Sequence, residues 1–288
     1  AIGDFYGPDG LDTGGIGAAE DHLGGFPPGA VRVFDWDGST WQQVGETIEG
    51  TGAGGDGDSA LPEFFGWSVA LSSNGERVVA GSTLQARAFD YDSVNGWTQA
   101  GNAFGSSDQV NGAVAISADG NRVAVGPGLI TYLTGSGPFV VQIFDYDVSD
   151  GWVQAGSDID GDTEDNFSGT SVAMSADGQV VAVGDVVGDT GDGSVRVLNY
   201  VDGDWNQSSA TIHPSPGVGL FGYSVAISAD GTRIAASGNS PEQGTAEPVE
   251  IFDLDGTAWQ QTATVAPGFA VAISCLLYTS DAADDQAC

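Results

Sequence analysis

Residues 221–236 read FGYSVAISADGTRIAA, and this short pattern recurs along the chain. Val225 and Ile227 alternate with small or polar residues, a period of two that is typical of a β-strand. Asp230-Gly231 follows, and these residue types tolerate the positive φ angles that a tight hairpin turn requires. The apolar sequence IAA then returns. We therefore predict a β-hairpin in this stretch.

Copies of this hairpin divide the chain into repeats. Its first strand recurs at residues 68–72, 113–117, 171–175, 224–228 and 270–274. Its Asn-Gly or Asp-Gly turn recurs at residues 74–75, 119–120, 177–178 and 230–231. Short apolar runs bounded by turn residues predict an all-β protein, because no helical stripe of apolar residues competes with them.

A second hairpin follows each time and carries a tryptophan. Its first arms lie at residues 31–36, 86–91, 141–146, 195–200 and 249–254, and its second arms begin at Trp41, Trp97, Trp152, Trp205 and Trp259. Successive tryptophans are 56, 55, 53 and 54 residues apart by difference, and a glutamine stands two residues after each. Aromatic residues at regular spacing are most simply interpreted as core.

Four short strands per repeat predict one antiparallel sheet whose two faces are both fairly apolar. Such a sheet cannot bury its faces alone, and packing several around an axis gives a β-propeller. The expected domain covers residues 1–274, with a partial blade at 1–45, blades at about 64–101, 112–156, 168–207 and 221–261, and a lone first strand at 269–274. The five repeats predict either a closed five-blade ring or a fragment of a propeller of about six to eight blades.

Two stretches, FGWSVA at residues 65–70 and FGYSVA at residues 221–226, resemble the opening of the FG-GAP repeat of integrin α-chain propellers and of many secreted proteins. The resemblance covers residues 1–274 and implies a truncated β-propeller repeat protein of the cell surface. Calcium-binding members of that family carry an extended acidic loop in the first hairpin. Here the loop is only ADGN at residues 118–121, so we expect the family calcium site to be absent.

The net charge of −34, from 40 acidic and six basic residues, excludes several partners. Nucleic-acid binding needs a basic surface, and an anionic membrane would repel this chain. No run of 18 apolar residues is present, so we expect no membrane span. A cation, a cationic partner or a neutral glycan stays open, and so does simple solubility in a salty medium.

Residues 275–288 break the repeat pattern. The sequence CLLYTSDAAD at residues 275–284 resembles the in-frame translation of a sequencing adapter, so we predict that this tail is not native protein sequence and leave it out of fold reasoning. Both cysteines, Cys275 and Cys288, lie in it, which removes disulfides and thiol chemistry from the rest of the chain. The alternative is an acidic tail closed by a Cys275–Cys288 disulfide.

The long connections predict which face of the propeller binds. In a four-stranded antiparallel blade, the second-to-third and fourth-to-first connections lie on one rim, which we call the long-loop rim. All the long segments belong to it: residues 4–29, 46–66, 127–139, 157–169, 185–193 and 237–248. Binding usually resides in loops on a rigid scaffold, so we place any functional site on this rim.

Some of these loops are acidic enough to suggest a Ca²⁺ site, with oxygen ligands from alternating aspartates. The candidate metal ligands are Asp160, Asp162, Asp165, Asp189 and Asp192. The competing interpretation is a set of solvated turn residues, since aspartate and glycine favour turns.

The preferred function is a secreted or cell-surface binding and adhesion module that contacts protein or glycan through the long-loop rim. One alternative is a glycan hydrolase or lyase that uses a pair of carboxylates on the same rim. Another is a structural repeat within a larger surface protein. His22 and His213 are isolated in the sequence, so a hydrolytic triad is not supported.

Overall fold

A computed structural model describes residues 2–4, 28–52, 63–105, 111–128, 139–161, 168–187, 192–240 and 245–273. This part of the chain contains only strands, turns and irregular segments, which confirms the all-β prediction. The described residues include no helix with the length and hydrophobicity needed to cross a bilayer.

Four sheets have four antiparallel strands each, and we call them blades 2 to 5. Blade 2 contains β6 (Val69–Leu71), β7 (Arg77–Ala80), β8 (Arg87–Asp92) and β9 (Gly96–Gln99). Blade 3 contains β10 (Ala113–Ile116), β11 (Arg122–Gly126), β12 (Gln142–Asp147) and β13 (Gly151–Gln154). Blade 4 contains β14 (Ser168–Met174), β15 (Val180–Asp185), β16 (Ser194–Val201) and β17 (Asp204–Gln207). Blade 5 contains β18 (Ser224–Ile227), β19 (Arg233–Ser237), β22 (Pro248–Asp255) and β23 (Ala258–Pro267), with a small hairpin of β20 (Asn239–Ser240) and β21 (Thr245–Ala246) between β19 and β22.

The N-terminal strands form an incomplete blade, which we call blade 1. A three-stranded sheet joins β1 (Ile2–Asp4), β2 (Ala30–Arg32) and β5 (Ile48–Glu49), and β3 (Phe34–Trp36) pairs with β4 (Trp41–Gln43). Gly3 lies opposite Val31, just as Gly184 lies opposite Val195 in blade 4. Strand β1 therefore takes the place of the second strand of a blade.

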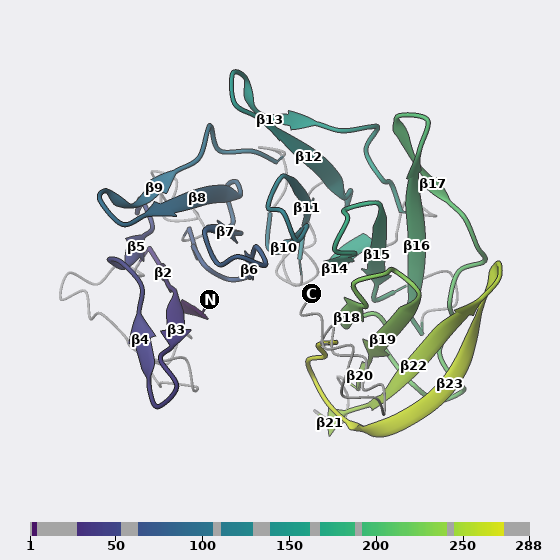
Figure 1. The fold of residues 1–288 in the computed structure, drawn as a ribbon. Coiled ribbons are helices and arrows are strands. Elements are labelled where there is room, and N and C mark those ends of the chain that lie inside the picture. Colours follow the sequence, from purple (N-terminus) through teal and green to yellow (C-terminus); the bar gives the residue numbers. More distant parts are fainter. Residues whose placement is uncertain are drawn as a thin grey trace, which may run out of the picture.

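The sheets are arranged around a common centre (Figure 1). Strands β6, β10, β14 and β18 lie innermost, and each contacts the next around the ring. The ring is open, with a gap between blade 1 and blade 5 (Figure 1). The described strands thus have the radial arrangement of a propeller, and they do not form the closed five-blade ring that was one of the two expectations.

Residues 269–273, expected as a lone first strand, form no strand within the described part of the chain. They nevertheless lie where a sixth inner strand would begin. The Val271 N–H donates to Ser224 Oγ at 3.1 Å, just as the Val114 N–H donates to Ser68 Oγ at 3.2 Å between blades 2 and 3. Residues 274–288, including the tail predicted not to be native, lie outside the described residues.

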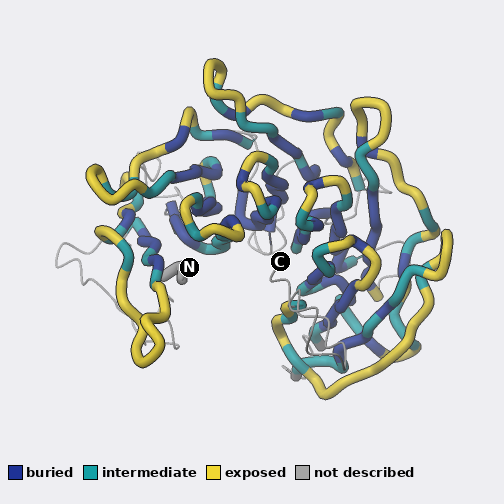
Figure 2. The backbone as a smooth tube through the Cα atoms, in the orientation of Figure 1, coloured by how far each residue is buried: buried dark blue, intermediate teal, exposed yellow. Residues whose placement is uncertain are grey.

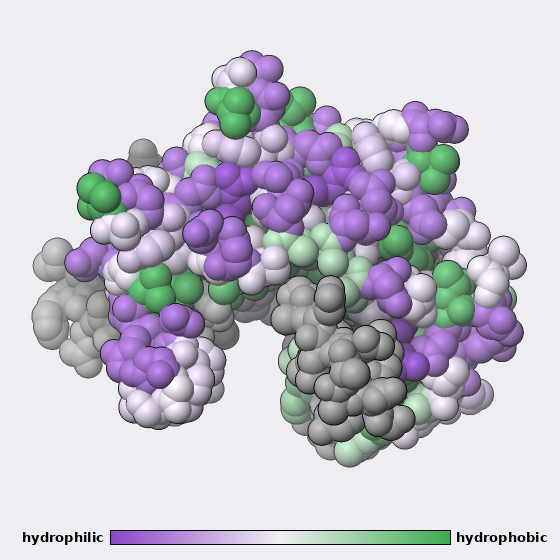
Figure 3. Space-filling view, viewed as in Figure 1, coloured by the Kyte–Doolittle hydropathy of each residue, from purple (hydrophilic) through white to green (hydrophobic). Residues whose placement is uncertain are grey.

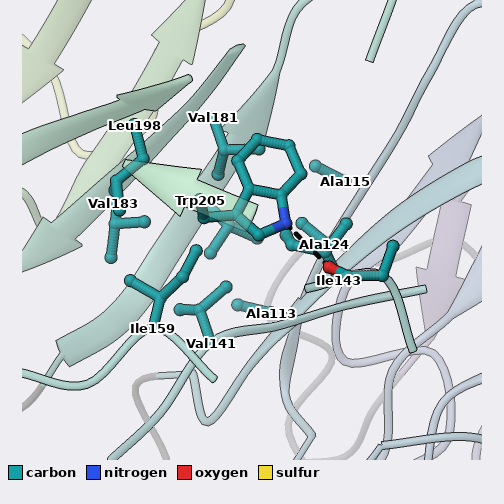
Figure 4. Packing of buried hydrophobic residues seen from close by; sticks show 12 residues of the cluster. Ala113, Ala115, Ala124, Val141, Ile143, Ile159, Val181, Val183, Leu198 and Trp205 are labelled. Atoms are coloured by element: carbon teal, nitrogen blue, oxygen red, sulfur yellow. Dashed lines mark hydrogen bonds between the residues drawn. The ribbon is translucent and has the colours of Figure 1, made fainter. Parts of the chain in front are cut away.

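The hydrophobic core lies between neighbouring blades rather than inside any one of them. Buried residues follow the inner strands, and exposed residues follow the outer hairpins (Figure 2). One such cluster takes Val141 and Ile143 from blade 3 and Val181, Val183 and Trp205 from blade 4 (Figure 4). Each sheet therefore buries its faces against the next sheet, as the apolar faces of the repeat require.

Candidate binding surfaces

Three of the recurring tryptophans hold one blade to the blade before it. The indole Nε1–H of Trp97 donates to the Val44 carbonyl at 2.7 Å. The equivalent bonds join Trp152 to Ala100 and Trp205 to Ala155, each at 2.9 Å. The bond of Trp205 is the dashed line in Figure 4. These side chains are thus occupied in the core, which agrees with the structural interpretation of the tryptophan series.

A glycine lies beside each of these three indoles. Gly45, Gly101 and Gly156 have φ angles of +70°, +71° and +82°. A Cβ on Gly156 would lie 2.9 Å from the Trp205 ring, so a side chain there would collide with it. The recurring glutamine fixes the same turn, because its side-chain amide donates to the carbonyl of this glycine in all three blades. We call this arrangement the Trp–Gly contact.

Two arginines cover the same aromatic residues. The Arg77 guanidinium pairs with Asp90 of its own blade at 2.5 Å and donates to the Gly120 carbonyl of blade 3 at 3.0 Å. Its Cζ lies 4.1 Å from the Tyr146 ring centroid, a cation–π distance. Arg122 repeats this arrangement against blade 4, where it lies over the rings of Tyr200 and Trp205.

Beneath the long-loop rim of blade 4 lies a buried ion pair. Arg196 Nε donates to Asp185 Oδ2 at 2.7 Å, and the two side chains are 5% and 1% exposed. The same guanidinium donates to Ser168 Oγ at 2.6 Å and to the Asp160 carbonyl at 2.8 Å. A buried arginine with these partners fixes the bases of two long connections at once.

Blade 2 has a second buried pair at the equivalent strand position. The Arg87 Nη2 donates to Glu63, whose other carboxylate oxygen accepts from the Thr51 N–H at 2.6 Å and the Gly52 N–H at 3.0 Å. Burial lowers the pKa of Arg87, and the attraction of Glu63 opposes that effect. The loop that contains residues 51 and 52 is thereby tied to the sheet.

The structure tests the predicted calcium ligands only in part. Asp160 is bound through its carbonyl to Arg196, and the Asp192 carbonyl accepts from the Phe221 N–H at 2.8 Å. Among the described residues, no three histidine, cysteine or acidic side chains come together as a metal site. Asp162, Asp165 and Asp189 lie outside the described residues, so calcium binding at this loop cluster stays a prediction.

A polar pocket of about 290 Å³ opens between the short turns of blades 2 and 3. It is lined by Ser72, Asn74, Glu76, Arg77, Asp90, Tyr91, Asp119 and Asn121. Asp90 is held by Arg77. Burial acts to raise the pKa of Asp119, but hydrogen bonds from Ser117 and Asn121 outweigh it and the pKa is lowered. Asp119 therefore stays ionised and does not act as a general acid near neutral pH.

The faces at the two open ends of the arc are unlike those between blades. Arg233 of blade 5 pairs with Asp253 as Arg77 pairs with Asp90, yet its side chain is 52% exposed against 13% for Arg77. Trp41 of blade 1 is 66% exposed, whereas Trp152 is 4% exposed. The face of the molecule that Figure 3 shows is mostly hydrophilic, with separate small hydrophobic spots.

These blades and their contacts define a β-propeller-like repeat protein. Among solved structures, the chain is similar to a periplasmic gluconolactonase from Pseudomonas aeruginosa (16% identity, TM-score 0.56, 82% of this chain and 64% of that one). It is also similar to a protein from Lactobacillus plantarum (12% identity, TM-score 0.55, 84% of this chain and 67% of that one). Hydrazine synthase from Kuenenia stuttgartiensis matches at 14% identity and a TM-score of 0.46, over 68% of this chain and 48% of that one.

The chain thus spans about half to two thirds of the length of these proteins. At such low identity the likeness shows the fold alone, and the activities in those names are not carried over. No family model and no curated protein sequence matches the chain.

Proposed function

We propose that this protein is a secreted or cell-surface binding and adhesion module that contacts a protein or a glycan through its long-loop rim. The observation that carries the proposal is the pair of buried arginine–carboxylate clusters, Arg196–Asp185 and Arg87–Glu63, beneath that rim. Both anchor long connections to the sheets, and binding loops on rigid scaffolds are the usual way a repeat fold acquires function.

The blades are proposed to be of the FG-GAP type. Phe65 and Phe221 are both fully buried, and each meets a phenylalanine of its own blade edge to face at about 6 Å. Gly222, the second residue of the pair, has a φ of +87°, and a Cβ there would lie 2.5 Å from the Ser194 carbonyl oxygen. The Phe-Gly pair thus has a defined packing role in blades 2 and 5.

The open arc favours a propeller of six to eight blades over a complete five-blade one. Val271 already makes the contact of a following inner strand, and Arg233 presents the face that elsewhere receives another blade. In this proposal the exposed end faces are inter-blade surfaces, and the ligand surface is the rim.

A glycan array and a cell-surface protein capture assay with the whole chain test the proposed function. The variant replaces three acidic residues of one long loop, Asp160→Asn, Asp162→Asn and Asp165→Asn. The matched control removes the same charge from hairpin turns on the opposite rim, with Asp150→Asn, Asp202→Asn and Asp255→Asn.

Binding that the loop variant loses and the control retains supports the rim. Equal loss in both variants contradicts it, because charge alone would then explain the binding. Release of reducing sugar from an arrayed glycan would favour the hydrolase alternative instead.

A further inference from the structure

The interface between blades 4 and 5 departs from the three before it. The residue that should be the glycine of the Trp–Gly contact is Ser209, and its φ is not positive. A residue with a Cβ enters the left-handed region only at a cost, so Ser209 does not form the turn that Gly156 forms in blade 3. The segment that follows the end of β17 at Gln207 therefore takes another course before Ile212 pairs with Val195.

The changed course leaves the next tryptophan without its acceptor. Ala155 keeps a backbone hydrogen bond to the Ile143 carbonyl, but Ser208 at the equivalent position forms no such bond within the described chain. The Trp259 indole N–H, unlike those of Trp97 and Trp205, has no hydrogen-bond acceptor among the described residues. A hydrogen-bond donor is thus left open at this interface.

The residues that cover the tryptophan elsewhere are replaced as well. The arginine position is occupied by Val180, its aspartate partner by Asn199, and the tyrosine beneath it by Leu254. All three members of the arginine cluster change together at this one interface, although its glutamine still donates to the Ser209 carbonyl at 3.0 Å. The interfaces between blades 2 and 3 and between blades 3 and 4, which both keep this cluster, therefore provide the comparison within one molecule.

A cavity of about 250 Å³ opens at this interface, lined in part by Trp259. Its apolar wall comes from Trp259, Phe252 and Ile212, and its polar wall from Thr211, Thr257 and His213. No carboxylate lines it, although the chain carries a net charge of −34. A pocket without carboxylates in so acidic a protein fits a neutral ligand better than a cation.

We propose that this cavity binds one pyranose unit of a neutral glycan. The indole and its apolar neighbours offer a surface for the C–H face of the sugar ring. The two threonine hydroxyls, the imidazole and the open indole N–H offer donors and acceptors for sugar hydroxyls. This site uses none of the acidic loops of the long-loop rim, so it goes beyond the proposed function. Failure of the sugar site would leave the proposed function of the rim untouched, and failure at the rim would leave the sugar site untouched.

The direct test follows the indole N–H resonance of Trp259 in the whole ¹⁵N-labelled chain, assigned by its loss in Trp259→Phe. The probes are methyl β-D-glucopyranoside, methyl β-D-galactopyranoside, methyl α-D-mannopyranoside and N-acetylglucosamine. We expect at least one probe to shift this resonance saturably with a Kd of about 1 mM, while the Trp205 indole does not move. No shift with any probe at about 50 mM overturns the proposal.

Ser209→Gly provides a variant that is expected to fold better while losing the site. A glycine restores the turn and gives the Trp259 N–H a carbonyl, so we expect Tm to rise by about 2–4 °C and sugar affinity to fall at least about tenfold. The matched control Ser209→Ala removes the same hydroxyl but keeps the Cβ, and its affinity should be unchanged.

A second variant tests the polar wall without altering the turn. Thr257→Val should weaken sugar binding about threefold or more at an unchanged Tm. Unchanged affinity in both Ser209→Gly and Thr257→Val would show that the sugar binds elsewhere and would overturn the assignment.

Discussion

Ser228 and Asp230 show at the scale of single residues why the Ser-x-Asp-Gly turn recurs. The Ser228 hydroxyl donates to Asp230 at 2.6 Å and accepts from the Arg233 N–H at 2.9 Å. Asp230 also accepts from the Thr232 N–H at 3.0 Å. Two short side chains thus satisfy the backbone of the turn, which otherwise would have to be solvated.

These bonds make the turn sensitive to pH. Hydrogen bonds from Ser228 and Thr232 lower the pKa of Asp230. Because the folded-state pKa lies below the unfolded one, the turn stabilises the fold at neutral pH and loses that contribution as pH falls below about 4. We expect an NMR titration of Asp230 to have its midpoint below the usual aspartate value.

Ser228→Ala should return that midpoint toward the usual value and destabilise the fold by about 1 kcal/mol at pH 7. The same substitution at Ser149, in an exposed turn of blade 3, is the control and should leave the Asp230 titration unchanged. An unshifted midpoint in Ser228→Ala would contradict the assigned hydrogen bond.

At the scale of elements, the Trp–Gly contact sets how one blade meets the next. Gly156→Ala tests it, because the new Cβ would lie against the Trp205 ring and the φ of +82° would be strained as well. Gly203→Ala is the control, since Gly203 has a φ of +87° and nothing within 4 Å of the added Cβ. Chemical denaturation should show a loss of about 1–2 kcal/mol for Gly203→Ala and about 1–3 kcal/mol more for Gly156→Ala. Equal losses of stability in the two variants would mean that the collision with Trp205 does not destabilise the fold.

The strands themselves could be predicted because their pattern is local. Val225 and Ile227 alternate with small residues, Asp230-Gly231 closes the turn, and β18 and β19 lie on either side of it. The ring of sheets followed from the near-constant tryptophan spacing, because a repeated sheet with two apolar faces must pack against its neighbours.

The buried polar contacts could not be predicted, since their partners lie in connections of no fixed length. Glu63 and Arg87 are 24 residues apart, and Asp160 and Arg196 are 36 apart. The cavity beside Trp259 did leave a signal that was missed: the residue four positions after Trp41, Trp97 and Trp152 is glycine, and after Trp205 it is Ser209. The position after Trp259 is Ala263, which has no following blade in the described chain, so Ser209 is the break that falls at an interface between two described blades.

At the scale of the whole molecule, 40 acidic residues repel one another. Added salt screens that repulsion, with a screening length that falls from about 10 Å at 0.1 M to about 3 Å at 1 M. We therefore expect Tm to rise between these concentrations when NaCl is added. Equal ionic strength supplied by KCl should have the same effect, and a flat or falling Tm would contradict screening as the cause.

The open arc makes two chemically equivalent arginines unequal. Arg77 pairs with Asp90, lies over Tyr146 and donates to the Gly120 carbonyl of the next blade, while Arg233 keeps only the pair with Asp253 among the described residues. Arg77→Gln should cost about 1–3 kcal/mol, because it removes a cation–π contact and a charged hydrogen bond between blades. Arg233→Gln should cost no more than about 1 kcal/mol, as expected for a solvent-exposed pair.

Appending the rest of one further blade, a copy of residues 175–220, after residue 273 removes that inequality if the end face of blade 5 is an inter-blade surface, because residues 270–273 already match residues 171–174 of a first strand. The added blade brings Tyr and Trp side chains and an Asp-Gly turn carbonyl to Arg233, so Arg233→Gln should then cost as much as Arg77→Gln in chemical denaturation. Arg77→Gln serves as the internal reference, since its surroundings do not change with the extension. A cost for Arg233→Gln that stays near zero in a folded, extended chain would show that this face is not built to receive another blade.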